Sequence, residues 1–264
     1  MAGPTLLAVA GWPVAHSCSP QMFAPALAQV GLDWRYLRLP LPPERFAETA
    51  RALGASGYRG INVTLPHKAA AHDVAQELTP AAAAIGAVNT LTYGPEAIHG
   101  DNTDAGGFID ALAADPAGWR CLVLGAGGSA RAVVWALREA GAEVAVWNRT
   151  AERAAALAAD FGVAHATEPD AADLVVNCTS VGLDQTTDPD AAAAAVGLAA
   201  VEPPQVLFDL TYGAGETPLA RWAARGGGRA IDGAEMLVRQ GARSFEGWTG
   251  RPAPLDAMRA GLRP

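Results

Sequence analysis

A glycine-rich turn between two apolar runs is the feature of this sequence whose chemistry is clearest. Residues 121–124 are apolar, and they are followed by Gly125, Ala126, Gly127, Gly128 and Ser129. Glycine permits a tight turn and a close approach of the backbone to a phosphate. The N-terminus of a following helix, expected over 131–140, adds free N–H groups and partial positive charge. With the second apolar run at 144–147, the pattern is typical of a dinucleotide-binding unit, although an ordinary glycine-rich turn is the alternative.

The end of the second apolar run indicates which dinucleotide is bound. A site for NAD usually has Asp or Glu there, which accepts a hydrogen bond from the ribose 2′-hydroxyl. This chain has Asn148, Arg149 and Thr150 instead, with Arg153 one helical turn later. Because guanidinium groups pair with a 2′-phosphate, we expect NADP. The alternative is that both arginines are only solvent-exposed residues at the start of a helix.

Polar side chains also follow two other segments that we expect to be strands. Ser17 and Ser19 come after residues 6–10, and Lys68 comes after residues 58–63. In α/β proteins, ligands bind where strands end. Lys68 is the only lysine of a chain that otherwise uses arginine, which favours a functional role for it. The serines could instead only cap the next helix, and Ser19 is the natural N-cap for a helix that begins at Pro20.

Strands alternate with helices along the chain, which is typical of an α/β fold with parallel sheets. We expect strands over 6–10, 34–39, 58–63, 87–93, 121–124, 144–147, 162–166, 173–178, 206–210 and 230–232. We expect helices over 20–30, 43–53, 69–78, 81–84, 105–114, 131–140, 151–159, 217–225, 234–247 and 256–262. Residues 184–204 are rich in Asp, Pro and Ala and indicate a surface excursion with one weak helix. Residues 115–118 mark a domain boundary.

Composition excludes several classes of protein. The chain has 264 residues, half of them apolar, and a formal net charge of −8 without any basic run, which argues against nucleic acid or an anionic membrane as partner. No apolar run is long enough to span a bilayer and no leader precedes the first strand, so we expect a cytoplasmic protein. Cys18, Cys121 and Cys178 are far apart and the five histidines are scattered, which suggests neither disulfides nor a metal site.

Several ordered segments resemble the shikimate dehydrogenase family over nearly the whole chain. The segments are 11–20, 62–68, 86–90, 100–104, 125–129, 148–150, 209–212, 217–219 and 233–240. Several motifs in compatible order are far more specific than one glycine turn. Phe23 and Ala24 stand where the family often has His-Asn, on the first expected helix, and we expect them to be structural.

The resemblance implies two α/β domains and an activity. A substrate-binding and catalytic domain with a mixed, mostly parallel sheet would comprise residues 1–115 and 234–264. A Rossmann-type NADP-binding domain would comprise residues 116–233. The implied reaction is the reversible, NADP-dependent reduction of 3-dehydroshikimate to shikimate, by a monomer or homodimer.

The resemblance also implies roles for individual residues. It makes Lys68 the catalytic acid and base, with Asp104 as its partner, and it assigns the substrate carboxylate to Ser17 and Ser19. The remaining substrate-binding residues would be Thr64, Asn89, Tyr212 and Gln240, with Asp104 also near a ring hydroxyl. The cofactor site would hold Gly125, Ala126, Gly127, Gly128, Ser129, Asn148, Arg149, Thr150, Arg153, Thr179 and Gly233.

The chemistry of a ketone reduction agrees with these roles. Hydride transfer builds negative charge on the carbonyl oxygen, so a nearby acid must protonate it. A carboxylate beside Lys68 favours the ammonium form that donates this proton. Asp104 could also, or only, cap the helix expected after it.

Three alternatives remain open. A quinate/shikimate dehydrogenase with relaxed choice of cofactor or substrate would carry the same motifs. An enzyme similar to methylenetetrahydrofolate dehydrogenase would also have two domains and a catalytic lysine, but it needs a larger, more aromatic cleft and no serine pair. A non-catalytic dinucleotide sensor is expected to have lost Lys68 or Asp104, and both are present.

Overall fold

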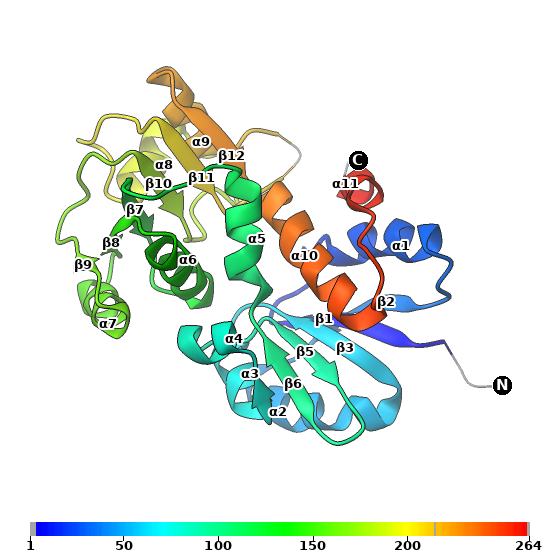
Figure 1. Ribbon diagram of the computed structural model, residues 1–264. Helices are drawn as coiled ribbons and strands as arrows, with labels where there is room; N and C mark the ends of the chain where they lie inside the picture. The colour runs from blue at the N-terminus through cyan, green and yellow to red at the C-terminus, as the bar shows by residue number, and fades with distance from the viewer. Residues whose placement is uncertain (1–3, 214, 263–264) are drawn as a thin grey trace. The chain divides into compact units, whose positions relative to one another are not determined.

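The computed structural model describes residues 4–213 and 215–262 (Figure 1). Residues 1–3 and 263–264, at the ends of the predicted substrate domain, and Ala214 lie outside the described residues. The chain divides into two compact units: residues up to Gly107 together with those from Leu237 onward, and Phe108–Met236. Helices α5 (Thr103–Leu112) and α10 (Gly233–Thr249) each begin in one unit and end in the other.

The first unit is built on a mixed six-stranded sheet of order β2-β1-β3-β5-β6-β4. Its strands are β1 (Leu6–Gly11), β2 (Arg35–Pro40), β3 (Tyr58–Val63), β4 (Glu77–Leu78), β5 (Thr90–Tyr93) and β6 (Ile98–Asp101). Strand β1 pairs in parallel with both β2 and β3, whereas β5 runs antiparallel to both β3 and β6. The carboxyl ends of β1 and β3 therefore lie side by side at one edge of the sheet.

Helices cover both faces of this sheet. On one face, Leu7 and Val9 pack in a core cluster with α1 (Ser19–Gln29), α10 and α11 (Leu255–Leu262). On the other face, the alternate residues Ala8 and Ala10 pack with α2 (Pro43–Ala52), α3 (Lys68–Val74) and α4 (Pro80–Ile85). A short 3₁₀ turn, Gly54–Ser56, precedes β3. Phe23 is fully buried in the first cluster, where it stacks on Tyr36, so it is a core residue.

The second unit contains an all-parallel six-stranded sheet of order β12-β11-β10-β7-β8-β9. Its strands are β7 (Arg120–Leu124), β8 (Glu143–Trp147), β9 (Ala164–His165), β10 (Leu174–Asn177), β11 (Val206–Asp209) and β12 (Arg229–Asp232). Its further helices are α6 (Gly128–Glu139), α7 (Ala151–Phe161), α8 (Pro189–Ala195) and α9 (Pro218–Arg225). Two six-stranded sheets, one mixed and one parallel, confirm the predicted α/β class.

Two features of the first sheet differ from the sequence-based expectation. The helix expected over 69–78 ends at Val74, and Glu77–Leu78 is strand β4, which pairs in parallel with β6. Strand β6, Ile98–Asp101, was not expected as a strand at all. Its His, Gly and Asp conceal the apolar pattern, yet Gly100 belongs there because a Cβ would come within 3.0 Å of Ala75, Leu78 and Val88.

The helix caps also differ from expectation. Helix α1 begins at Ser19 itself, its N-cap is Cys18, and no side chain caps it, so the prediction of Ser19 as N-cap is wrong. Asn102 rather than Asp104 caps α5, because its Oδ1 accepts from the backbone N–H groups of Asp104 and Ala105. Thr217, expected as helical, is the N-cap of α9.

Two further segments differ from the sequence-based expectation. The strand expected over 87–93 begins only at Thr90, so Asn89 lies just before it. The segment 184–204 does contain one helix, α8, but Ala192, Ala193 and Val196 are buried in the core of the second unit rather than exposed.

Within the described residues, no helix is long and apolar enough to cross a membrane, and no group of three or more His, Cys, Asp or Glu is arranged to hold a metal ion.

Close packing of α10 on β3 gives a test of the fold. A Cβ at Gly60 would lie 2.1 Å from Trp248 Nε1, whereas a Cβ at the exposed Gly247 of α10 meets nothing within 4 Å. We expect Gly60→Ala to lower the free energy of unfolding by about 1–3 kcal/mol through overpacking. Gly247→Ala should raise it by up to about 1 kcal/mol through helix propensity. Urea unfolding of both variants measures this, and equal effects would contradict the packing described.

Candidate active site

A buried ion pair joins the single lysine to a carboxylate from another element. Lys68 is the first residue of α3 and Asp104 lies in the first turn of α5. Lys68 Nζ lies 2.5 Å from Asp104 Oδ2, and the two residues are 8% and 6% exposed. Because transfer of charges out of water is costly, such a pair persists only where further hydrogen bonds satisfy its remaining polar atoms.

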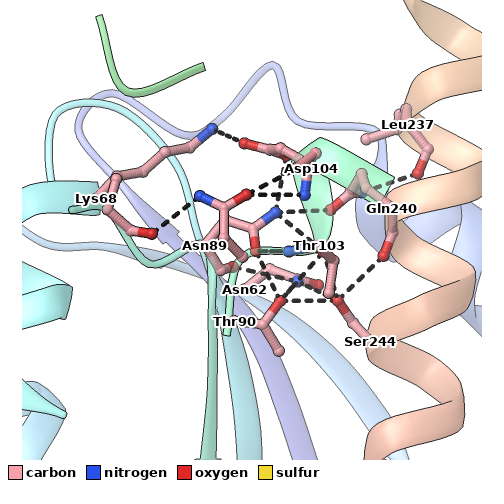
Figure 2. Close-up of polar contacts among 12 residues, drawn as sticks. Asn62, Lys68, Asn89, Thr90, Thr103, Asp104, Leu237, Gln240 and Ser244 are labelled. Carbon is pink, nitrogen blue, oxygen red and sulfur yellow. Dashed lines mark hydrogen bonds and ion pairs between the residues drawn. The ribbon is translucent and has the colours of Figure 1, made fainter. Parts of the chain in front are cut away.

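The amide of Asn89 supplies one of these bonds and is itself held in place (Figure 2). Its Nδ2 donates to Asp104 Oδ1 at 2.7 Å, and its Oδ1 accepts from the backbone N–H of Thr103 at 2.8 Å. Since a backbone N–H can only donate, this contact determines which end of the amide faces Asp104. Both carboxylate oxygens of Asp104 therefore receive a donor.

A buried polar layer, formed by Asn62, Thr90, Thr103 and Ser244, lies against Asn89 (Figure 2). Ser244 Oγ accepts from Asn62 Nδ2 at 2.9 Å and lies 2.8 Å from Thr90 Oγ1. Thr90 Oγ1 in turn donates to Asn89 Oδ1 at 3.1 Å. Among the described residues, no buried side-chain nitrogen or oxygen lacks a hydrogen-bond partner. A fully satisfied network of this kind holds its members in one arrangement.

Sequence reasoning did not identify Thr90, Thr103 or Ser244 as part of the site. One signal for Ser244 was available: it lies four residues after Gln240, and residues with this spacing share a helix face. The two threonines give no such signal, because their contacts with Ser244 span 154 and 141 positions of the chain.

Gln240 reaches the same group because α5 and α10 approach closely. A Cβ at Gly107 would lie only 2.6 Å from the backbone nitrogen of Gln240, so the approach requires glycine. The side chain of Gln240 donates to Leu237 O at 2.8 Å, and its Oε1 lies 3.4 Å from Asn89 Nδ2. Of the residues predicted to bind substrate, Gln240 and Asn89 are thus brought into contact.

Ser17, Ser19 and Thr64 lie at the edge where β1 and β3 end. Both serines are buried, and Ser17 Oγ donates to Ser19 Oγ at 3.3 Å. Thr64 is half-buried in the turn that leads to Lys68, and its backbone N–H donates to Ala10 O of β1. The structure therefore places these predicted substrate residues at the same sheet edge as Lys68.

The glycine turn has the expected geometry in the second unit. Gly125 has φ +109°, a left-handed conformation that favours glycine. A Cβ at Gly127 would meet no atom within 4 Å, so space for a ligand lies in front of the backbone. Ala130 is fully buried where α6 packs against the sheet. Helix α6 has no side-chain cap and no acidic residue in its first turn, which leaves its N-terminus suited to an anion.

The predicted cofactor residues after β8 lie on an exposed turn. Arg149, Thr150 and Arg153 are exposed, and Asn148 Nδ2 donates to Thr150 O at 2.9 Å. Thr179 follows β10, whose neighbours in the sheet are β7 and β11, and it donates through its hydroxyl to Asn177 Oδ1 at 2.7 Å.

A buried carboxylate shapes the turn that carries Tyr212. Asp209 accepts from Thr217 Oγ1 at 2.6 Å, from Asn177 Nδ2 at 2.8 Å and from the Thr211 backbone. Burial raises the pKa of Asp209, and these hydrogen bonds oppose the rise. Gly233 packs on the same turn, where a Cβ would lie 2.2 Å from Leu210 O. Tyr212 belongs to the second unit, as does the predicted cofactor residue Gly233, whereas the other predicted substrate residues belong to the first.

Two further groups have shifted pKa values without a place in the chemistry above. Burial raises the pKa of the Cys121 thiol to about 12, as expected for an inert core cysteine. Burial also raises the pKa of Tyr36, whose hydroxyl donates to Asn62 Oδ1 at 2.7 Å, while a hydrogen bond with Ser19 opposes the rise.

Family models match most of the chain. The shikimate dehydrogenase substrate binding domain matches residues 9–91, which include Lys68 and Asn89. A shikimate/quinate 5-dehydrogenase model matches residues 111–183, which include the glycine turn, and the shikimate 5′-dehydrogenase C-terminal domain matches residues 233–263. An NADP⁺-dependent shikimate dehydrogenase of Acidiphilium cryptum is 43% identical over 263 residues, which cover 96% of this chain and 94% of that protein. The chain belongs to the shikimate dehydrogenase family.

Solved structures of the family have the same fold. The shikimate 5-dehydrogenase of Thermus thermophilus, in complex with NADP(H) and shikimate, is 39% identical with a TM-score of 0.86 over 98% of both chains. The fold also resembles 5-ketofructose reductase of Gluconobacter sp. strain CHM43, which is 30% identical with a TM-score of 0.85 over 98% of both chains. A protein named for a different substrate therefore shares this fold. The fold alone does not identify the substrate, so the residues that contact the substrate must do so.

The histidine before Lys68 gives a test at this site. His67 is buried, stacks on Phe46 and lies with Nε2 2.7 Å from Leu41 O. Burial lowers its pKa, and the Leu41 contact opposes the shift. Because the folded pKa lies below the unfolded one, the unfolded state binds more protons on acidification, so stability is present near neutrality and is lost as the pH falls.

We expect the free energy of unfolding of the wild type to fall by up to about 1 kcal/mol more than that of His67→Gln as the pH is lowered from about 7.5 to about 5.5. His165→Gln, which removes an exposed histidine of β9, is the control and should follow the wild type. Denaturant titrations at each pH measure the slopes, and parallel slopes for His67→Gln would contradict the burial argument.

Proposed function

We propose that this protein catalyses the reversible, NADP-dependent reduction of 3-dehydroshikimate to shikimate, a step in the biosynthesis of aromatic amino acids. The observation that carries the proposal is the buried pair of Lys68 and Asp104, fixed by Asn89, in a chain of the shikimate dehydrogenase family. A protein that only sensed dinucleotides would have no need for an ion pair that is costly to bury.

Lys68 acts as the proton donor in the reductive direction. When bound, NADPH supplies a hydride to the carbonyl carbon of the substrate. The electron pair of the carbonyl bond moves onto its oxygen, and Lys68 Nζ donates a proton there to complete the alcohol. Asp104 keeps the ammonium directed and compensates its charge, and Asn89 keeps Asp104 in place. In the oxidative direction, Lys68 accepts the hydroxyl proton.

The substrate is held by the polar groups around this pair. Ser17 and Ser19 bind its carboxylate, and Thr64, Asn89 and Gln240 bind its ring hydroxyls, together with Asp104. Tyr212, on the turn held by Asp209, also contacts the substrate. The serine pair favours a substrate with a carboxylate, which distinguishes shikimate from ketofructose.

The residues of the second unit fit NADP. The open space at Gly127 and the uncapped N-terminus of α6 suit a pyrophosphate, which residues 125–129 would hold. Arg149 and Arg153 would pair with the 2′-phosphate, and Asn148 and Thr150 would border it. Thr179 and Gly233 complete the cofactor site.

These roles divide the chain into two functional domains. Residues 1–115 and 234–264 form the substrate-binding and catalytic domain, and residues 116–233 form the NADP-binding domain. We expect the enzyme to work in the cytoplasm as a monomer or a homodimer.

A spectrophotometric assay separates the candidate activities. The wild type is mixed with shikimate and NADP, with quinate and NAD, and with 5-ketofructose and NADPH, and the absorbance of the reduced cofactor is followed. Turnover with shikimate and NADP alone supports the proposal, faster turnover with quinate and NAD indicates the relaxed relative, and no turnover in any mixture overturns an enzymatic function.

Lys68→Ala tests the proton donor. We expect kcat to fall by about 10²- to 10⁴-fold, with KM for shikimate nearly unchanged, because the chemical step rather than binding is lost. Lys68→Arg is the matched control: it keeps a charge beside Asp104, but a guanidinium does not release its proton, so it should be as inactive as Lys68→Ala. High activity of Lys68→Arg, or a large rise of KM with intact kcat in Lys68→Ala, would contradict the role.

A further inference from the structure

One arginine ties the loop between β1 and α1 to the neighbouring strand. Arg38 of β2 donates from Nε and from Nη2 to the backbone oxygen of Ser17, at 3.0 and 2.6 Å. The same Nη2 donates to Gln21 Oε1 of α1 at 2.8 Å. The guanidinium thus contacts residues on both sides of Ser19, and sequence reasoning assigned it no role.

These contacts orient one peptide group. The peptide bond between Ser17 and Cys18 is trans, since the cis bonds of the described residues precede Pro13 and Pro66. In a trans peptide the C=O and N–H point in opposite directions, so the bond from Arg38 to Ser17 O directs the N–H of Cys18 away from the guanidinium. Within the described residues this N–H has no hydrogen-bond partner.

The start of α1 is left electropositive. Its N-cap, Cys18, makes no side-chain hydrogen bond to the helix, and its first turn holds no acidic residue. Ser17 Oγ and Ser19 Oγ bond one another, at 3.3 Å, and the Ser19 N–H makes only a long contact of 3.4 Å to Ser17 Oγ. Ser19 also forms a hydrogen bond with Tyr36, so an anion would replace a long contact at Ser17 and would compete with this bond at Ser19.

We propose that Arg38 is a positioning residue for the substrate carboxylate: it fixes the peptide between Ser17 and Cys18, so that the two serine hydroxyls and the Cys18 N–H are presented together to a carboxylate. The proposal rests on the function proposed above, because it takes the carboxylate of shikimate as the ligand. Arg38 acts through Ser17 and does not touch the substrate. Its charge also favours an acidic ligand over a neutral one.

Another arginine of the same strand provides a matched control. Arg35 carries the same charge on β2, but its side chain is 63% exposed and pairs with the exposed Asp33, at 3.1 Å. Removal of Arg35 changes the net charge of the protein by the same amount as removal of Arg38, and it leaves the contacts in the loop between β1 and α1 in place.

The experiment compares Arg38→Leu, Arg38→Lys and Arg35→Leu with the wild type, using shikimate and its methyl ester, which lacks the charge. In Arg38→Leu we expect KM for shikimate to rise by about tenfold or more, as for loss of a charge-assisted hydrogen-bond pair. The kcat for shikimate and KM for NADP should stay within about twofold of the wild type. The ratio of KM for the ester to KM for the acid should fall towards one. Both KM for shikimate and the ester-to-acid ratio of Arg38→Lys should lie between those of the wild type and Arg38→Leu. Both values of Arg35→Leu should match the wild type.

The outcomes separate this inference from the proposed function. If the wild type does not oxidise shikimate, the proposed function fails. If the wild type does so and Arg38→Leu behaves like Arg35→Leu, or loses acid and ester equally, the role of Arg38 is overturned. Should Arg38→Leu fail to fold, Arg38→Lys decides alone: an unchanged preference for the acid over the ester contradicts the proposal.

Discussion

The burial of an ammonium group against a carboxylate constrains the rest of the first unit. Lys68 and Asp104 are both buried, and loss of either partner would leave an uncompensated buried charge. The pair is tolerable because Asn89 occupies the second oxygen of Asp104 and a backbone N–H fixes Asn89. The proposed chemistry and the stability therefore depend on the same few hydrogen bonds, so the proposed proton donor is held in position before any substrate arrives.

That arrangement requires helices and strands to approach closely. Gly107 lets α10 come near enough for Gln240 to meet Asn89, and Ser244, one turn later, closes the polar layer against β3 and β5. The strands that carry this layer also contribute to a hydrophobic core cluster of the first unit, as Ile61 and Leu91 do. A polar network in such surroundings is specific because each missing hydrogen bond would leave a buried group unsatisfied. The loop between β1 and α1 follows the same principle, since Arg38 satisfies the carbonyl of Ser17 with two hydrogen bonds and so orients a peptide.

Local patterns were sufficient for much of this fold, and packing determined the rest. The glycine turn, its flanking apolar runs and the α/β class followed from the sequence because such signals lie within a few residues. Lys68 stood out as the single lysine. Asn102 caps α5 through a local contact, whereas the sequence suggested the cap only as an alternative role of Asp104. Strand β4 has two residues and β6 is polar, and each depends on a pairing partner elsewhere in the chain. Ser244 and Arg38 escaped notice for the same reason: a serine on a helix or an arginine on a strand acquires a role only through its distant neighbours.

The single lysine makes the central claim directly observable. With lysine labelled by ¹⁵N at Nζ, the spectrum holds one side-chain ammonium signal, that of Lys68. We predict that this signal is visible at neutral pH, because the buried pair slows exchange with water, that it shifts on addition of shikimate, and that Asp104→Asn broadens or displaces it. A signal that behaves as a freely exchanging ammonium, with no response to shikimate or to Asp104→Asn, would contradict the account.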